Sequence, residues 1–349
     1  MDKKQAMMMV RPAYRQDIDP VTALAERSDS GLTNLPGDRS LIAERVERSL
    51  TSFDQRGETA EDASYLLVME DRTSGRLLGT AGIVRRVGIG EPFYAYRIKN
   101  HIQESMSLGL RKEVPCLHLK KIHHGPSEIG ALFMHPDFRR HGYGRLMSLS
   151  RFHFLAAHAE RFPSKVLAEM RGITDRQGRS PFWEAVGRHF FDTDFSVADY
   201  LTAKNKRFIG ELMPSHPIYI PLLREEARSV IGKVHEGTKA ALKMLEGEGF
   251  TDSGMVDIFD AGPIIECRIR KIRSVRERKV ARYLGIRKSK TDPGPWLVSV
   301  GHWKDFRACI SQDILVEKEG VRLPGSVAEI LRIQHGEPLS YSFLRPREA

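Results

Sequence analysis

The sequence predicts a mixed α/β fold, an α+β arrangement built on a mixed sheet, with a small β-barrel-like appendage at its C-terminal end. Over most of the chain, apolar runs of strand length alternate with helical patterns, but tight strand–helix–strand repeats are few. From about residue 293 the pattern changes to short strand candidates separated by Gly and Pro. The length of 349 residues also exceeds one average domain.

Two domains are therefore expected. The larger covers residues 1–290 and divides into a core over about 8–200 and an extension over about 200–290. The smaller, β-rich domain covers residues 291–349.

The N-terminal elements follow from hydrophobic spacing and from the residues that start helices. Asp17 or Asp19 can cap the first helix, and Pro20 suits its first turn. Turn-forming residues at 71–75 separate two apolar runs, a pattern typical of a hairpin. The elements expected here are a strand at 8–12, helices at 17–26 and 40–53, and strands at 65–69 and 77–84.

The rest of the chain continues this alternation. Segment 92–114 is ambiguous, because its pattern fits a strand or an inserted helix and loop. Ser180 can cap a helix that has Pro181 at its first position. Further strands are expected at 128–134, 165–170, 255–259 and 263–269, helices at 142–161, 180–190 and 238–248, and tail strands at 296–300, 308–316, 327–333 and 339–344.

Charge restricts the partners of the chain. The net charge is +10, and eleven Lys and Arg residues lie between Arg268 and Lys290 against one acid, Glu277. That run lacks regularly interleaved aromatics, and no nucleic-acid-binding motif is visible in the sequence. We interpret it as a solvated helix or as a surface that favours anionic phosphates, and we expect no nucleic-acid partner.

Cysteine usage and hydropathy indicate the compartment. Cys116, Cys267 and Cys309 are scattered and lack CxxC spacing, which argues against a disulfide framework and against a metal site. The Met-rich start has no apolar core of signal-peptide length, and no window reaches the roughly 18 apolar residues of a membrane span. We expect a cytoplasmic protein with no membrane contact.

The strongest chemical motif is the loop RRHGYG at 139–144, between the strand at 128–134 and the helix that follows. Its two glycines let phosphate oxygens approach the backbone, and the helix start presents N–H groups and a positive dipole end at the same point. Its arginines can pair with phosphate charge. The loop therefore predicts a pyrophosphate site. A glycine turn that merely starts a helix is the alternative, whereas a P-loop or a Rossmann fingerprint would need residues that are missing here.

A strand, a proline stop, Arg-x-x-Gly-x-Gly and a helix together resemble the CoA-binding core of the GCN5-related N-acetyltransferase superfamily. The opening at 10–13 with Asp17 is similar to the first strand and helix of that fold. Six further motifs are not general features of the superfamily, but in order and spacing they closely resemble the arginine N-succinyltransferase family. The resemblance covers about residues 8–280, with a weaker echo in the tail. The six motifs lie at 30–36, 168–172, 180–184, 210–219, 230–235 and 256–263.

This resemblance implies transfer of succinyl from succinyl-CoA to the α-amine of L-arginine in arginine catabolism. Succinyl-CoA would be a co-substrate, with no tightly bound cofactor. Members of the family also act on ornithine, and some assemble from two related subunits. We therefore expect a homo-oligomer or a hetero-oligomer with a related chain. Two alternatives stay open: another amino-acid acceptor such as ornithine, and a subunit that needs a related partner chain for activity.

The resemblance also suggests roles for single residues. His235 matches the proton donor of the family, and Leu132 matches its succinyl-CoA contact. A loop histidine without a chemical role is the alternative for His235. The residues expected to bind CoA are Leu132, Phe133, Met134, Arg139, Arg140, Gly142, Tyr143 and Gly144.

The chemistry requires proton transfer and stabilisation of an oxyanion. An imidazole titrates near neutral pH, which suits His235 to proton transfer. Glu128 stands where the superfamily often places a carboxylate that withdraws the amine proton through water, although a surface or capping carboxylate is an equal alternative. A backbone N–H around 132–134 can stabilise the oxyanion.

The charged ends of the substrate need partners as well. A guanidinium requires a carboxylate with planar, bidentate geometry, and Glu169, Glu184, Asp257 and Asp260 are the candidates in the family-like motifs. For the substrate's carboxylates, Arg171 is the first candidate and Arg188 the second, with structural salt bridges as the alternative. The residues expected to bind substrate are Glu169, Arg171, Trp183, Asp257 and Asp260.

Overall fold

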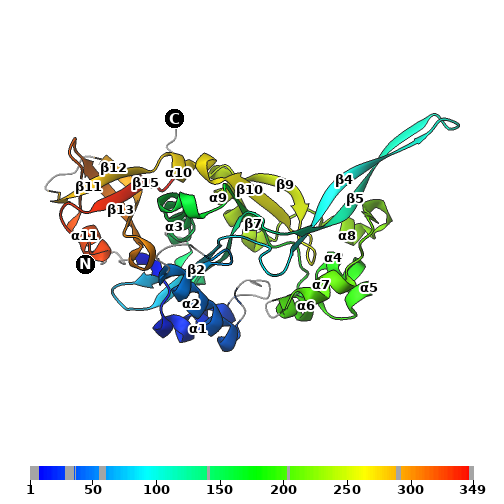
Figure 1. The fold of residues 1–349 in the computed structure, drawn as a ribbon, viewed down its shortest axis with the longest axis horizontal. Coiled ribbons are helices and arrows are strands. Elements are labelled where there is room, and N and C mark those ends of the chain that lie inside the picture. Colours follow the sequence, from blue (N-terminus) through cyan, green and yellow to red (C-terminus); the bar gives the residue numbers. More distant parts are fainter. Residues whose placement is uncertain are drawn as a thin grey trace.

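Figure 1 shows an elongated molecule with a β-barrel at one end, a helical extension at the other and a long hairpin projecting from that extension. Arg140 and His141 of the phosphate loop, and all of the 30–36 motif except Leu35, lie outside the residues that the structure describes. The computed structural model describes residues 8–27, 35, 37–54, 60–139, 142–202, 205–287 and 292–345.

A mixed sheet runs through the body of the molecule. Its strands follow the order β1-β2-β3-β6-β7-β10-β9-β4-β5-β8, and the β6–β7 pair is parallel while the other neighbours are antiparallel. These strands are β1 (Met8–Pro12), β2 (Ser64–Asp71), β3 (Leu77–Val84), β4 (Phe93–Ser105), β5 (Leu110–Ile122), β6 (Ser127–Met134), β7 (Lys165–Glu169), β8 (Ile218–Tyr219), β9 (Thr251–Val256) and β10 (Pro263–Arg268).

Strand β2 shows why its apolar run is continuous rather than alternating. Successive side chains point to opposite faces of a sheet, and here both faces are covered. Leu66 and Val68 pack in the core under α1 (Ile18–Glu26) and α2 (Arg39–Asp54), whereas Tyr65 and Leu67 pack in the core around α3 (Tyr143–Ala157). The helices and strands predicted for this part of the chain are confirmed.

Helix α3 is buried on every side, because it lies between the sheet and the barrel (Figure 1). Even its polar residues are enclosed: both ring nitrogens of His153 are hydrogen-bonded, to Ser299 Oγ at 2.8 Å and to Ser342 Oγ at 2.9 Å. Burial lowers the pKa of His153 to about 3, so this ring is neutral. These bonds fix the helix against the barrel strands β12 and β15.

The C-terminal barrel is closed by five strands in the order β12-β15-β11-β14-β13, with β13 pairing back to β12. The predicted β-barrel-like appendage is confirmed. Strand β13 also pairs with β1 through Val10 and Ala308, so the barrel continues the central sheet. The barrel strands are β11 (Lys279–Ile286), β12 (Asp292–Val300), β13 (Arg307–Val316), β14 (Val321–Leu323) and β15 (Pro338–Phe343).

The strand predicted at 327–333 is wrong, because this segment forms helix α11 (Gly325–Leu331). Val327, Ile330 and Leu331 have helical spacing and place one apolar face against the barrel core. The basic run at 268–290 was interpreted as a solvated helix or a phosphate-favouring surface. The helix reading does not hold, since most of the run contributes short turns and strand β11. Strand β11 belongs to the barrel and begins at Lys279, which lies before the expected domain boundary at residue 290. The position of that boundary stays a prediction.

The extension consists of short helices packed around an aromatic core, and the long hairpin β4–β5 projects beyond it (Figure 1). The ambiguous segment 92–114 therefore holds strand β4 and the start of β5, not an inserted helix. The described helices here and near the barrel are α4 (Pro181–Ala185), α5 (Arg188–Phe191), α6 (Phe195–Thr202), α7 (Arg207–Leu212), α8 (Glu225–Arg228), α9 (Lys239–Gly247) and α10 (Arg273–Arg276).

A buried ion pair joins α9, α10 and the barrel. Glu248 follows α9 with a fully buried side chain, and its Oε1 accepts from Arg273 Nη2 at 2.6 Å. Its other oxygen accepts the backbone N–H of Ser274 at 2.8 Å. Arg273 also donates to the carbonyl oxygen of Phe343 in β15 at 3.2 Å. This ion pair and its hydrogen bonds thus connect the end of α9, helix α10 and strand β15.

Removing this charge should destabilise the protein strongly. We expect Glu248→Gln to lower the free energy of unfolding by about 3–5 kcal/mol, because the buried Arg273 would lose its buried counter-charge and keep only Glu277, at 2.8 Å and partly exposed. Urea unfolding followed by circular dichroism measures the change. The matched control is Glu47→Gln, which breaks the exposed Arg15–Glu47 pair and should have little effect. Equal losses in both variants would contradict the expectation.

Candidate active site

The phosphate loop has the backbone geometry that its glycines predicted. Gly142 caps the start of α3 with φ +78°, a left-handed conformation that glycine adopts without strain. Among the residues that the structure describes, a Cβ on Gly144 would meet no atom within 4 Å, so none of them fills this side of the loop. The first turn of a helix lacks helical partners for its N–H groups, and this turn faces the open side with the positive end of the α3 dipole.

Arg139 fixes the strand that leads into this loop. Its Nε donates to the carbonyl oxygen of Met134 at 3.1 Å, and its guanidinium lies 5.9 Å from the ring centre of Phe133. The residue is exposed, so it can still meet an anion in front of the loop. Arg140 lies outside the described residues.

Strand β6 carries an irregularity at the centre of the sheet. Its pairing with β3 shifts register so that Ala131 and Leu132 lie opposite the single residue Ala81. Ala131 has φ +48°, and Thr80 Oγ1 donates to its carbonyl oxygen at 2.9 Å. Such a bulge re-aims the backbone. Leu132 is half-buried at this point.

The ladder between β6 and β7 is short. It contains the pairs Ser127–Val166 and Glu128–Leu167 and then ends, although β6 continues to Met134. The bulge therefore lies where β6 has no ladder to β7 among the described residues. A ligand lying along this edge would meet backbone groups of β6.

A buried carboxylate ties the end of β7 to the turn between β9 and β10. Asp260 accepts the N–H of Gly172 at 2.6 Å and the N–H of Gly262 at 2.8 Å, one on each oxygen. The approach requires glycine at both positions. A Cβ on Gly172 would lie 2.3 Å from the Asp260 carbonyl oxygen, and one on Gly262 would lie 2.0 Å from the Met170 carbonyl oxygen.

His235 is held at the same junction. Its N–H donates to the carbonyl oxygen of Arg171 at 2.9 Å, and Val234 forms a bridge with Gly172. The Nδ1 atom of the ring accepts the N–H of Gly237 at 3.1 Å. A neutral ring with this bond carries its proton on Nε2. The half-buried side chain is therefore oriented by the backbone around it.

Carboxylates gather around this junction. Burial raises the pKa of Glu169 well above its usual range, and the charges of Glu128 and Asp257 raise it further. Burial also raises the pKa of Asp199 to about 8, with a further contribution from Asp257. The pKa of Asp260 is raised well above its usual range by burial and by Asp257. The structure thus places Glu128, Glu169, Asp257 and Asp260 near one another, while the role of each stays a prediction.

Basic residues border the carboxylates. Arg171 opposes the rise in the pKa of Asp199, and Lys206 opposes that of Glu169. The Nη2 atom of Arg171 donates to Thr174 Oγ1 at 3.2 Å. Burial lowers the pKa of Arg45, which Glu128 counteracts. The site therefore combines an acidic centre with cations at its border.

Other sequence candidates lie elsewhere or have other partners. Trp183 is fully buried, its Nε1 donates to the Thr193 carbonyl oxygen at 2.9 Å, and its ring stacks on Phe259 at 5.3 Å. It forms part of the core beneath the site, and a substrate contact stays a prediction. Glu184 and Arg188 pair with each other at 3.6 Å near the surface. In the described part of the chain, no group of three or more His, Cys, Asp or Glu residues could hold a metal ion.

Asp199 and Arg45 belong to the site but were missed in the sequence. Asp199 lies on the short helix α6, outside every motif, and reaches the site through the packing of the extension. Arg45 lies on α2 among several exposed charges, and only its burial against Glu128 distinguishes it. Neither carries a local sequence signal.

Comparisons with known proteins show the family of this chain. The family described as arginine N-succinyltransferase beta subunit matches residues 8–274, and its C-terminal domain matches residues 276–342. The chain belongs to the arginine N-succinyltransferase family. The predicted family, fold class and enzyme class, an acyl-CoA-dependent N-acyltransferase, are confirmed.

Curated relatives and a solved structure cover nearly the whole chain. The arginine N-succinyltransferase of Yersinia pseudotuberculosis serotype O:3 (strain YPIII) is 41% identical over 338 residues, which are 95% of this chain and 96% of the relative. That of Citrobacter koseri is 42% identical over 309 residues, 87% and 88% of the two chains. The structure of arginine/ornithine succinyltransferase subunit AI from Pseudomonas aeruginosa superposes with a TM-score of 0.90 at 32% identity, covering 98% of this chain and 100% of that chain. Among the described residues, no helix has the length and apolar composition needed to cross a membrane.

The Asp260 junction gives a prediction for stability. We expect Asp260→Asn to lower the free energy of unfolding by about 1–3 kcal/mol, because an amide nitrogen cannot accept the N–H of Gly172 or Gly262. Thermal and urea unfolding measure the loss. The matched control is Asp175→Asn in an exposed turn, where water can replace the lost bonds. A variant of Asp260 as stable as the control would show that the junction does not depend on this carboxylate.

Proposed function

We propose that the chain transfers succinyl from succinyl-CoA to the α-amine of L-arginine, giving N2-succinylarginine and CoA. The observation that carries this proposal is the segment that follows β7: it begins after Glu169, holds the backbone of His235 through the Arg171 carbonyl oxygen, and brings the Arg171 charge near Asp199. Membership of the family supports it. We also propose that the enzyme acts in the cytoplasm as part of arginine catabolism.

The donor would lie along β6 as a co-substrate, without a tightly bound cofactor. Its pyrophosphate would bind Arg139 and the backbone around Gly142 and Gly144. Its thioester would reach the bulge at Leu132, where a backbone N–H of the 132–134 segment can stabilise the oxyanion that forms during attack. A backbone N–H that is already positioned to donate a hydrogen bond to the oxyanion typically contributes about 3 kcal/mol to transition-state stabilisation.

The acceptor would bind in the acidic centre. A guanidinium cation offers donors in a planar fork, and Glu169, Asp199 and Asp257 are the carboxylates available to accept from it. Asp260 is less suited to this contact, because its oxygens already accept the N–H groups of Gly172 and Gly262. Arg171 would pair with the carboxylate of the amino acid or of the succinyl group.

Proton transfer completes the reaction. The α-ammonium loses a proton to Glu128 through water, and the resulting amine attacks the thioester carbon. As the tetrahedral intermediate collapses, the nitrogen loses its second proton to water and the C–S bond breaks. The departing thiolate gains a proton from the imidazolium form of His235, which leaves the ring neutral, the form in which Nδ1 accepts the N–H of Gly237. Burial and the charges of Glu128 and Asp257 raise the pKa of Glu169, which favours its protonated form and lets it serve as a hydrogen-bond donor.

Ornithine is a second candidate acceptor, because the structurally similar protein is named arginine/ornithine succinyltransferase. The same name includes the word subunit, which favours an oligomer of this chain with itself or with a related chain. Measuring kcat/KM for arginine and for ornithine, with succinyl-CoA and with acetyl-CoA, separates these activities. No turnover of arginine with succinyl-CoA by the purified chain, alone or with a related subunit, would overturn the proposal.

His235 provides the test of the catalytic step. We expect His235→Ala to reduce kcat at least a hundredfold, the usual contribution of a positioned acid–base group, while the Kd for CoA changes little. A thiol-release assay and CoA titration measure the two quantities. His335→Ala, at an exposed barrel turn, is the matched control and should keep full activity. Near-normal kcat in the His235 variant would refute the role.

The raised carboxylate pKa values predict proton release when arginine binds. At pH 7 the free protein holds a proton on Asp199, whose pKa is raised to about 8, and a bound guanidinium favours the charged forms of Asp199 and Glu169, which lowers their pKa values. Calorimetry in buffers of different ionisation enthalpy should therefore detect proton release. The release should diminish above pH 8, where Asp199 is already ionised, and in Asp199→Asn. Proton uptake on binding would contradict the assignment.

A further inference from the structure

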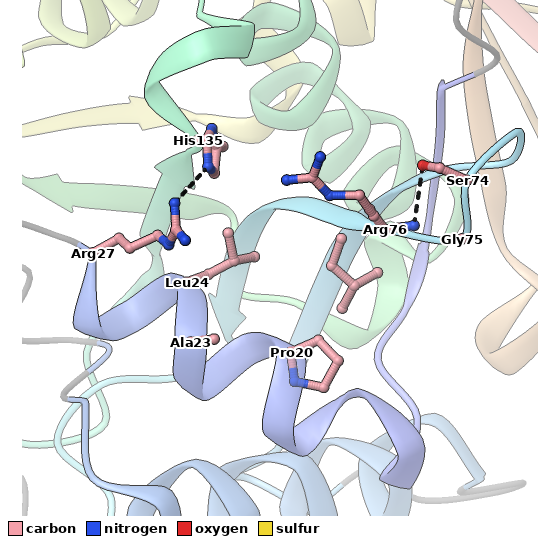
Figure 2. A pocket seen from close by; sticks show the side chains of 9 residues that line it. Pro20, Ala23, Leu24, Arg27, Ser74, Gly75, Arg76 and His135 are labelled. Atoms are coloured by element: carbon pink, nitrogen blue, oxygen red, sulfur yellow. Dashed lines mark hydrogen bonds between the residues drawn. The ribbon is translucent and has the colours of Figure 1, made fainter.

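A hollow near the phosphate loop is not used by the mechanism above. It has a volume of about 350 Å³ and is formed by α1, the turn between β2 and β3, and the end of β6 (Figure 2). This volume falls within the range of about 300–1,000 Å³ that is typical of small-molecule sites. The hollow is therefore large enough for part of a cofactor-sized molecule.

Two arginines line the hollow, and neither has a carboxylate partner in the described part of the chain. Arg27 Nη1 donates to His135 Nε2 at 3.2 Å, and the guanidinium of Arg76 extends toward the same space (Figure 2). Nearby arginines differ in this respect: Arg39 pairs with Asp19, and Arg72 pairs with Glu70. Two cations that converge without counter-charge favour an anionic ligand.

The floor of the hollow is apolar. Leu24 is 4% exposed and Leu77 is 8% exposed, and Pro20 and Ala23 continue this aliphatic surface along α1. A small inorganic anion would not use such a floor. The combination of two guanidiniums and an aliphatic surface suits a ligand that has a flat, weakly polar body and a phosphate group.

The hollow and the phosphate loop lie at the same edge of the sheet. His135 lines the hollow and directly precedes the short turn (Pro136–Phe138) that enters the loop, and its N–H donates to the Leu78 carbonyl oxygen at 2.8 Å. Asp71, at the other end of the β2–β3 turn, acts electrostatically on Tyr143 at the first position of α3. A molecule whose pyrophosphate binds the loop can therefore extend into the hollow.

We propose that this hollow binds the 3′-phosphoadenosine end of the acyl-CoA donor, with the 3′-phosphate between Arg27 and Arg76 and the adenine on the floor formed by Leu24 and Leu77. The proposal rests on the proposed function, since it places one end of the same donor. CoA carries its 3′-phosphate on the ribose next to the pyrophosphate, so both phosphate groups bind at one edge of the sheet. The thioester end remains free to reach the bulge in β6.

The experiment compares two donors that differ by the 3′-phosphate, succinyl-CoA and 3′-dephospho-succinyl-CoA. We expect Arg76→Gln to raise the KM for succinyl-CoA about tenfold, with kcat unchanged, because one charge-assisted contact is lost. With the dephospho donor the same substitution should have no further effect. Arg27→Gln should behave in the same way. Arg39→Gln is the matched control, since this exposed arginine of the neighbouring helix lies outside the hollow.

Direct binding keeps this inference separate from the proposed function. Calorimetric titration with CoA and with 3′-dephospho-CoA needs no acceptor and gives a result even when no arginine is succinylated. Weaker binding of CoA by Arg76→Gln, with equal binding of dephospho-CoA by both proteins, supports the hollow as the phosphate site. An equal loss for both ligands, or no loss for either, overturns it. Because Arg76 is exposed, its replacement should leave the fold intact.

Discussion

The buried carboxylate of Asp260 is the contact on which the arrangement of the active site depends. By accepting the N–H groups of Gly172 and Gly262, it fixes the end of β7 against the β9–β10 turn. The segment so fixed carries Arg171, whose carbonyl oxygen in turn holds the backbone of His235. The segment after β7, the β9–β10 turn and the segment at His235 are distant in sequence and are thus held next to one another. No side chain larger than hydrogen fits at either glycine without a shift of the backbone around it.

A similar constraint orients the donor side. The phosphate loop is the N-terminal end of α3, and α3 is enclosed by the sheet on one side and by the barrel on the other. The two hydrogen bonds of His153 to Ser299 and Ser342 fix the helix along its axis. The barrel therefore contributes to the active site indirectly. By holding α3 in place, it fixes the position of the N-terminal end of that helix, where the positive end of the helix dipole faces the phosphate loop.

The sequence predicted what local pattern determines. The strand at 128–134, the loop and the helix at 142–161 follow from apolar spacing and from Gly142, whose left-handed backbone angle other residues rarely adopt. The far half of the β4–β5 hairpin could not be predicted, because it is exposed on both faces and so lacks the alternation of a half-buried strand. Segment 327–333 is expected to be a strand because it is one of several short apolar pieces separated by Gly and Pro, although Val327, Ile330 and Leu331 have helical spacing. Asp199 reaches the site only through tertiary packing, and the residues next to it in the sequence form no pattern that would indicate this.

The acidic centre is unfavourable in the absence of a cation, and this explains how the site can distinguish its acceptors. Carboxylates close together in a buried site retain protons, which reduces their repulsion. A guanidinium supplies the missing charge and, through its planar fork, can satisfy two carboxylates at once. The ammonium of ornithine is a compact charge on a shorter chain and would contact fewer of them. The spacing of Glu169, Asp199 and Asp257 should therefore determine how far the enzyme favours arginine, whereas the donor side, set by α3, is common to both reactions.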